Sequence, residues 1–240
     1  MLIKILNKLS YPFIYLRDFL IESSLNNLSE KELFTSIYKS GYWKPLIGGS
    51  LSGSGSSEEA TVNIKKELPH FLSNRNIKSI LDIPCGDFNW MAEIDLSSVK
   101  YIGAEIVEEL VLNNQNNFSK ENRSFIVCDL LKDDLPSIDL IFVRDCFVHL
   151  TDVQIQTALS NIINSDAKYF ASSTYPNIHE NIKSKKKDRW RALNLTSPPF
   201  SLPEPLEELD DGWPQIELHA NKKIGIWLME DLKKQPKYQL

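Results

Sequence analysis

Residues 79–90, with the sequence SILDIPCGDFNW, decide the fold of this chain. The run 79–83 is short, apolar and rich in isoleucine, so it predicts a buried β-strand. Gly86 follows three residues later, and a glycine lets the backbone turn tightly and approach a ligand with no Cβ in the way. In an open α/β sheet, ligands bind beyond the carboxyl ends of the strands, so this turn marks a candidate binding site.

Downstream of this turn, short apolar runs alternate with helix-compatible stretches. The runs 99–106, 124–128, 139–143 and 168–174 predict strands, while 107–118 and 151–163 predict helices. The second helix opens on a capping-box pattern, Thr151 with Gln154. Continuous apolar strands separated by helices indicate a parallel sheet covered on both faces, that is, a Rossmann-like, doubly wound α/β fold.

Two segments flank this core. Before it, the glycine- and serine-rich stretch 48–59 ends in Ser56 and Glu59, a capping-box pattern that predicts a helix running to about Leu68, just before Pro69. After it, 215–220 and 223–229 predict two strands of an antiparallel hairpin joined at Asn221-Lys222. We therefore expect a mostly parallel sheet that finishes in an antiparallel hairpin.

The N-terminal segment 1–24 is apolar and basic. Its leucines recur at three- and four-residue spacing, which predicts an amphipathic helix kinked near Pro12. This helix packs on the protein itself or on a second copy, or alternatively lies on a membrane surface. We divide the chain into an N-terminal helical arm with its loop, 1–57, and a catalytic domain, 58–240.

Composition narrows the partners and the location. The net charge is -5, which argues against nucleic acid as a partner. The three cysteines, Cys85, Cys128 and Cys146, are too far apart to form a metal site, and we expect buried thiols in a reducing compartment. No apolar run approaches the ~20 residues of a membrane span. The predicted location is the cytoplasm, with the inner face of the membrane as the alternative.

Polar side chains follow the predicted strands at one edge of the sheet. Glu105 ends the second strand about 20 residues after Gly86, where an acidic residue accepts hydrogen bonds from ribose hydroxyls in dinucleotide folds. Asp129 follows the third strand and is suited to an exocyclic amine, with Leu130 as an apolar contact to the base. Because no phosphate-binding glycine–lysine motif is present, the predicted ligand contains a nucleoside and no polyphosphate.

These features resemble the class I S-adenosylmethionine-dependent methyltransferases over roughly residues 79–232. A more specific set of motifs resembles that of a little-characterised bacterial group often found alongside surface-polysaccharide genes. These motifs are Trp43, SGSGS (52–56), LDIPCGDFNWM (81–91), YIGAEIV (101–107), RDCFVHL (144–150), WRALNL (190–195) and PPF–PEP (198–205). The resemblance implies S-adenosylmethionine as the cofactor, which would contact Asp82, Pro84, Cys85, Gly86, Phe88, Asn89, Glu105, Ile106, Asp129, Leu130, Arg144, Trp43, Ser52 and Gly53. The first turn departs from the class pattern D-x-G-x-G-x-G, since Pro84 and Phe88 stand where two glycines are expected.

Methyl transfer to a hydroxyl requires a group that removes the acceptor's proton. His149, after the fourth strand, is the predicted general base, and Asp145 either orients it or acts alone. Trp190, Arg191 and Asn194 are the predicted acceptor-binding residues, because aromatic faces stack on sugar rings and polar side chains bond hydroxyls. Trp43, Trp190 and Trp213 all lie in irregular segments, and the alternative is that these tryptophans hold the proline-rich loop on the sheet.

The predicted function is O-methylation of a sugar or surface-glycan precursor, without a metal. Two alternatives stay open at this stage. One is a non-catalytic cofactor-binding scaffold subunit that docks through the N-terminal helix. The other is a nicotinamide-dependent oxidoreductase, although that class favours a Gly-x-Gly-x-x-Gly turn and Gly86 stands alone.

Overall fold

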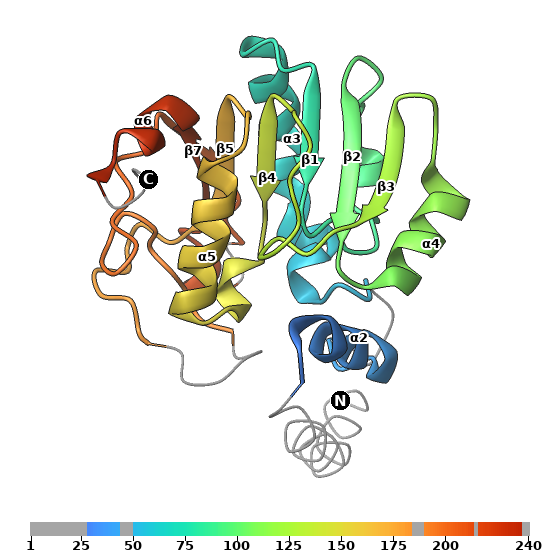
Figure 1. The fold of residues 1–240 in the computed structure, drawn as a ribbon, viewed down its shortest axis with the longest axis horizontal. Coiled ribbons are helices and arrows are strands. Elements are labelled where there is room, and N and C mark those ends of the chain that lie inside the picture. The colour runs from blue at the N-terminus through green and yellow to red at the C-terminus, as the bar shows by residue number, and fades with distance from the viewer. Residues whose placement is uncertain (1–27, 44–49, 184–189, 214–215, 237–240) are drawn as a thin grey trace, which may run out of the picture.

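The computed structural model describes residues 28–43, 50–183, 190–213 and 216–236. They form one seven-stranded sheet in the order β3-β2-β1-β4-β5-β7-β6 (Figure 1). The strands are β1 (Ser79–Asp82), β2 (Lys100–Glu105), β3 (Arg123–Val127), β4 (Leu140–Val143), β5 (Tyr169–Thr174), β6 (Glu207–Asp210) and β7 (Lys223–Leu228). The helices are α2 (Glu30–Ser40), α3 (Glu58–Asn74), α4 (Glu108–Phe118), α5 (Asp152–Ile163) and α6 (Met229–Lys233). The helix predicted within 1–24 lies outside the described residues.

The predicted fold class is confirmed. Strands β1 to β5 pair in parallel, whereas β7 runs antiparallel to both β5 and β6. The chain leaves β1 toward β2 and β3 on one side and continues through β4 and β5 on the other. The strand order therefore reverses between β1 and β4, and the carboxyl ends at such a switch point form the usual ligand crevice.

Each face of the sheet is covered by helices because successive strand residues point to opposite sides. In β1, Ile80 belongs to the cluster that includes Ile64 and Leu68 of α3, whereas the neighbouring Leu81 packs in the cluster that includes Ile155 of α5. Figure 1 shows α5 in front of the sheet and α3 behind it. This two-sided burial explains why the strands appear in the sequence as continuous apolar runs.

Helix α3 differs from its prediction at both ends. Its N-cap is Ser57, whose side chain accepts a hydrogen bond from Ala60 N, so the Ser56–Glu59 box is not the cap. The helix also continues through Pro69 to Asn74. Phe71 and Leu72, beyond the proline, are buried in the core. Burying these two side chains offsets the hydrogen bond that proline removes from the helix.

The predicted hairpin is wrong in its first strand. β7 pairs with β6, while Glu217–His219 form a single 3₁₀ turn, η4. The amides of this segment bond locally, from Ile216 N to Trp213 O and from His219 N to Ile216 O. Those donors are therefore not available for a strand ladder, and the connection between β6 and β7 is irregular.

Helix α2 was not predicted from the sequence. It begins at a capping box in which Ser29 and Glu32 bond each other's backbone amides, and it ends at Gly41. In Figure 1 it lies beneath the carboxyl ends of the strands. None of the described helices is long and apolar enough to cross a membrane.

Candidate functional site

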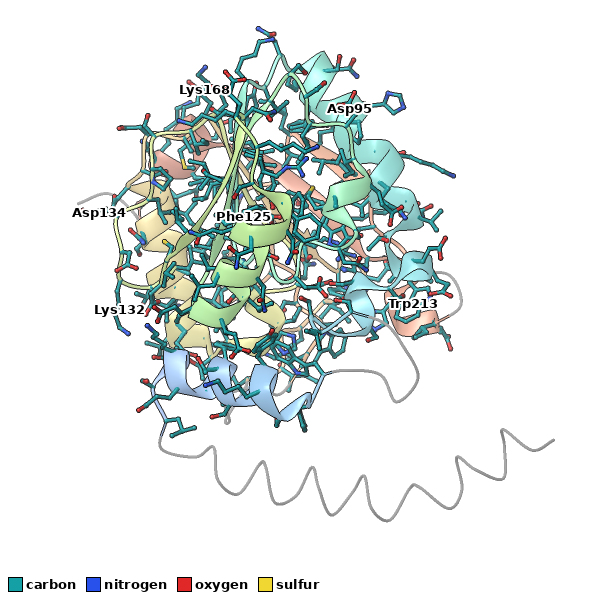
Figure 2. The ribbon with its side chains drawn as sticks, turned by 90° about the vertical axis from the view of Figure 1, so that its right-hand side faces the viewer. Asp95, Phe125, Lys132, Asp134, Lys168 and Trp213 are labelled. Carbon is teal, nitrogen blue, oxygen red and sulfur yellow. The ribbon has the colours of Figure 1, made fainter. Side chains whose placement is uncertain are left out.

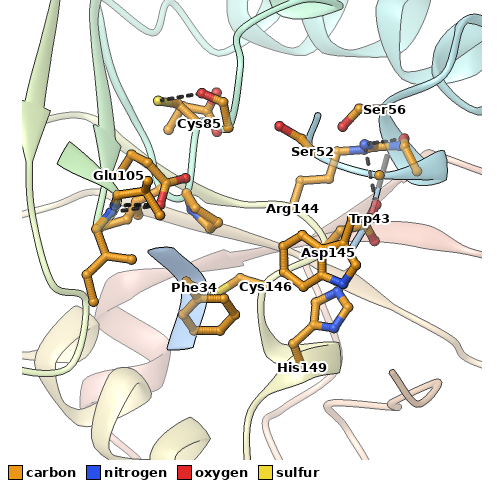
Figure 3. A pocket seen from close by; sticks show the side chains of 18 of the residues that line it. Phe34, Trp43, Ser52, Ser56, Cys85, Glu105, Arg144, Asp145, Cys146 and His149 are labelled. Carbon is orange, nitrogen blue, oxygen red and sulfur yellow. Dashed lines mark hydrogen bonds and ion pairs between the residues drawn. The ribbon is translucent and has the colours of Figure 1, made fainter. Parts of the chain in front are cut away.

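A cavity of about 800 Å³ opens at the carboxyl ends of the parallel strands (Figure 3). Most of the predicted site residues line it: Trp43, Ser52, Gly53, Asp82, Pro84, Cys85, Gly86, Glu105, Ile106, Asp129, Leu130, Arg144, Asp145, His149 and Trp190. Residues from both parts of the predicted domain division therefore face the same space. The division itself stays a prediction.

Glu105 ends β2 at the wall of this cavity. Its carboxyl is buried, and Oε1 accepts hydrogen bonds from Ile106 N at 2.8 Å and Val107 N at 3.2 Å. These two bonds fix the orientation of the carboxyl group. Burial raises its pKa, and the backbone donors only partly oppose that rise. Such a fixed carboxyl is suited to accept hydrogen bonds from a ligand's hydroxyl groups.

The first turn keeps a glycine-like backbone at two positions. Gly86 has φ 55°, and a Cβ placed there would collide with Ser52. Phe88 stands at an expected glycine position and has φ 59°, so the left-handed conformation is retained without glycine. That conformation costs a non-glycine residue about 1–2 kcal/mol. The ring packs fully buried against Tyr101 and Phe125, and this burial offsets the cost.

The segment 50–56 is fastened to this turn by Asp87. Asp87 Oδ2 accepts hydrogen bonds from Ser50 Oγ at 2.7 Å and Leu51 N at 2.9 Å. In return, Asp87 N donates to Ser52 Oγ at 2.8 Å. Three hydrogen bonds thus hold the serine-rich segment against the cavity, although the composition alone also fitted a flexible linker.

A buried charge network forms the opposite wall. Arg144 donates to both carboxylate oxygens of Asp211 and, through Nη1, to Gly55 O at 2.8 Å. Lys222 Nζ lies 2.7 Å from Asp145 Oδ2 and 2.8 Å from Asp211 Oδ2. Burial alone would raise the pKa of Asp145, but Lys222 and Arg144 outweigh it and hold that pKa well below its usual value. Asp145 is therefore ionised and paired, which makes it a poor general base.

Carboxyl groups outnumber basic groups in the lining. Among the described residues, the acidic side chains are Glu30, Asp82, Glu105, Asp129, Asp145 and Asp211, and the lysine and arginine side chains are Arg144 and Lys222. Asp82 is buried, and burial raises its pKa to about 7 although Tyr101 Oη donates to it. This balance favours a ligand that carries positive charge, and it disfavours a pyrophosphate.

Aromatic rings also line the cavity. Trp43 lies 4.7 Å from His149 between ring centroids. Trp190 and Trp213 lie 5.0 and 5.8 Å from the ring of His219, and Tyr175 Oη lies 3.0 Å from His219 Nδ1. Rings arranged in this way offer flat apolar faces together with polar edges to a bound molecule.

Four predicted site residues do not line the cavity. Phe88 is in the core and Asn89 is exposed. Arg191 donates to Leu150 O and pairs with Asp152, and Asn194 bonds Pro176 O and Ile178 O. Arg191 and Asn194 are both buried, and these bonds tie the loop after residue 190 to residues 150–152 and 176–178. These two side chains therefore hold the loop in place, whereas Trp190 faces the cavity.

Several lining residues were missed by the sequence reading. Phe34 and Tyr38 come from α2, for which the Ser29–Glu32 capping box was the available signal. Tyr175, His219 and Lys222 enter from the end of β5 and from the β6–β7 connection. Because His219 follows no parallel strand, the sequence predicts a structural role for it, whereas the structure places it in the lining. Figure 2 shows Trp213, from the same connection, at the periphery of the fold.

Cys85 and Cys128 are buried, Cys146 is half-buried, and all three are free. Within the described ranges, no group of three or more His, Cys, Asp or Glu side chains is arranged to hold a metal ion.

No protein-family model and no curated protein matches the sequence. Solved structures do match in fold. Human N-acetylserotonin methyltransferase in complex with SAM is 16% identical over 84% of this chain and 60% of that chain, with a TM-score of 0.56. The 1,6-didemethyltoxoflavin-N1-methyltransferase of Burkholderia thailandensis, with bound S-adenosylhomocysteine, is 15% identical over 82% and 85%, with a TM-score of 0.54. The PH0226 protein of Pyrococcus horikoshii OT3 is 15% identical over 73% and 93%, with a TM-score of 0.52.

These likenesses define the class of fold. The chain has the Rossmann-like fold of the S-adenosylmethionine-dependent methyltransferases.

Proposed function

We propose that this protein is an S-adenosylmethionine-dependent methyltransferase. The observation that carries the proposal is that Glu105, the Gly86 turn and the segment 50–56 face one cavity at the switch point of this strand order. The cofactor supplies an electrophilic methyl group on a positively charged sulfonium. An excess of carboxyl groups in the lining fits that charge and leaves the nicotinamide alternative without a site for its pyrophosphate.

The cofactor's parts match particular residues of the cavity. Glu105 would accept hydrogen bonds from the ribose hydroxyls, as an acidic residue does in dinucleotide folds. Leu130 would pack against the base, beside Asp129, whose carboxylate also bonds Leu131 N and Lys132 Nζ. Ser52 and Gly53 would cover the amino-acid end of the cofactor together with Trp43. Ser52 lies directly against the Gly86 turn, since a side chain at Gly86 would collide with it.

The acceptor that we infer is a hydroxyl of a sugar or surface-glycan precursor. The support is the set of aromatic rings in the lining, since such rings stack on the apolar faces of sugars while their polar edges bond hydroxyls. A pocket histidine would take the acceptor's proton. His149 is the one predicted from the sequence, with Asp145 beside it in the lining. We expect the enzyme in the cytoplasm, with the N-terminal segment as a contact to a membrane or a second copy.

Isothermal titration of the full chain with S-adenosylhomocysteine tests the cofactor site. We expect saturable binding that is weakened at least about tenfold in Glu105→Gln, the loss of about 1.4 kcal/mol of binding free energy. The matched control is Glu109→Gln, a surface acid of α4. Absence of binding to the wild-type chain would refute the proposal. The scaffold alternative predicts binding of the cofactor without methyl transfer to any acceptor.

A further inference from the structure

The connection between β6 and β7 brings a second histidine into the cavity. His219 lies in the 3₁₀ turn η4 and lines the pocket. Its Nδ1 is 3.0 Å from the hydroxyl of Tyr175, which follows directly after β5. One ring nitrogen is therefore held by a neighbour, and Nε2 is the nitrogen that remains for a bound molecule.

Aromatic packing fixes this ring. Trp190 meets it edge to face, with centroids 5.0 Å apart, and Trp213 stacks on it at 5.8 Å. These three rings come from two segments of the chain. Trp190 belongs to the loop that begins at residue 190, and Trp213 and His219 belong to the connection between β6 and β7. A histidine held by two indoles and one hydroxyl has little rotational freedom. A catalytic group needs such a fixed orientation toward the acceptor.

Burial, together with the charge of Lys222, favours the neutral form of this ring. Burial is the main cause that lowers the pKa of His219, and the positive charge of Lys222 lowers it further. The carboxylates of Asp145 and Asp211 act in the opposite direction, but each is paired with Lys222 and lies near Arg144. A histidine that is neutral near pH 7 is able to accept a proton.

We propose that His219 is the general base that deprotonates the acceptor hydroxyl through Nε2, and that Tyr175 is a positioning residue that sets its tautomer. Tyr175 would accept the Nδ1–H hydrogen bond and so leave the Nε2 lone pair facing the cavity. This inference rests on the proposed function. In the step, the acceptor oxygen forms a bond to the methyl carbon, the sulfur–carbon electron pair stays on sulfur, and the hydroxyl proton moves to Nε2 and then to solvent.

His149, the base predicted from the sequence, has different ring neighbours from those of His219. Its ring lies against Trp43, and Gly53 of the segment 50–56 lies close to the Cβ and Cγ atoms of the same tryptophan. His149 therefore sits beside the elements that we assign to the cofactor. His219 sits among Tyr175, Trp190 and Trp213, the elements that we assign to the acceptor. The acceptor's proton is expected on the acceptor side.

Nitrogen NMR of histidine-labelled protein with bound S-adenosylhomocysteine tests the tautomer without any acceptor. We assign the four histidines by single replacements. At pH 7.5 we expect His219 to be neutral with its proton on Nδ1, and to titrate below the unperturbed value of about 6.5. In Tyr175→Phe the Nδ1–H signal should be lost. A charged His219, or one protonated on Nε2 in the wild-type chain, would overturn the proposal.

Turnover is then measured as release of S-adenosylhomocysteine with a panel of methyl glycosides. With any member that reacts, His219→Gln should lose at least about 100-fold in rate. The affinity for S-adenosylhomocysteine should stay within about twofold. His70→Gln, a change on the exposed side of α3, is the control. Retention of wild-type turnover by His219→Gln would refute the base role even though cofactor binding persists, whereas failure of the proposed function would abolish that binding.

Discussion

Asp87→Ala should weaken cofactor binding without unfolding the protein. The Asp87 carboxylate accepts hydrogen bonds from Ser50 Oγ and Leu51 N, and both bonds disappear in the alanine variant. A hydrogen bond to a charged group contributes about 1.5–3 kcal/mol, so the closed position of the segment 50–56 loses about 3 kcal/mol at the lower end of that range. Asp87 N still donates to Ser52 Oγ, so part of the attachment survives.

If the closed segment is the form that binds, the apparent affinity falls with the fraction of molecules that remain closed. A loss of about 1.4 kcal/mol in that equilibrium corresponds to a tenfold change. The loss of about 3 kcal/mol therefore shifts this equilibrium by roughly 100-fold. Because the initial excess of closed molecules absorbs part of that shift, we expect the dissociation constant for S-adenosylhomocysteine to rise between about 10- and 100-fold. Isothermal titration measures this change. Urea unfolding of the same samples measures whether the fold itself has been weakened.

The matched control is Asp95→Ala. Asp95 also accepts a backbone hydrogen bond, from Ser97 N, but it is exposed and lies toward the end of the molecule opposite Trp213 (Figure 2). Its replacement should leave the dissociation constant within about twofold. If Asp87→Ala binds as tightly as this control, the segment 50–56 does not cover the cofactor, and that part of the reasoning is refuted.

Three further predictions concern stability. Asp211→Ala leaves Arg144 and Lys222 buried with one carboxylate fewer, so the free energy of unfolding in urea should fall by about 3–5 kcal/mol; a change under 1 kcal/mol would contradict the network. Arg191→Ala should be similarly destabilising, by about 3 kcal/mol, yet leave cofactor affinity unchanged, because the guanidinium holds the main chain at Leu150. Asp82 has a folded pKa of about 7, above the ordinary 3.8, so the folded state keeps a proton that the unfolded chain releases between these values. Its contribution to stability therefore falls as pH rises from about 4 to 7, and Asp82→Asn should gain stability relative to wild type over that window; parallel curves for the two proteins would exclude the shift.

The central fold was predictable because burial on both faces leaves a direct signal in the sequence. The run that became β1 and the four that became β2 to β5 were each located to within about two residues. The capping box of Thr151 and Gln154 also formed as expected. These signals are local, so a single sequence suffices to identify them.

The errors arose where tertiary contacts override local pattern. Pro69 indicated the end of a helix, but the burial of Phe71 carried the helix past it. The connection Asn221-Lys222 indicated a hairpin with a strand at 215–220, but within the described residues 216–220 no strand pairing forms, since β7 is already paired with β5 and β6. Pairing partners lie far apart in the sequence, and periodicity carries no information about which of them meet.

The residues of the candidate site also divide into those with a local sequence signal and those whose roles depend on tertiary contacts. Glu105 and Gly86 were identifiable because strand-end positions are fixed by the strands themselves. Asp87 and Asp211 were not, because their roles depend on partners more than 30 residues away, Ser50 at one side and Arg144 at the other. A single aspartate in a loop carries no mark of such a partner. The structure supplies that information by bringing the segments together.

Arg144 connects the two halves of the cavity. It donates to Gly55 O of the segment that we place over the cofactor, and it binds Asp211 at the start of the connection that carries His219. Because one buried guanidinium holds both, opening of the segment 50–56 removes a hydrogen bond from the group that organises the acceptor wall. A buried charge that loses a partner costs free energy, so the two elements should favour their closed positions together. Cofactor and acceptor are then expected to bind with positive coupling, each tightening the site for the other.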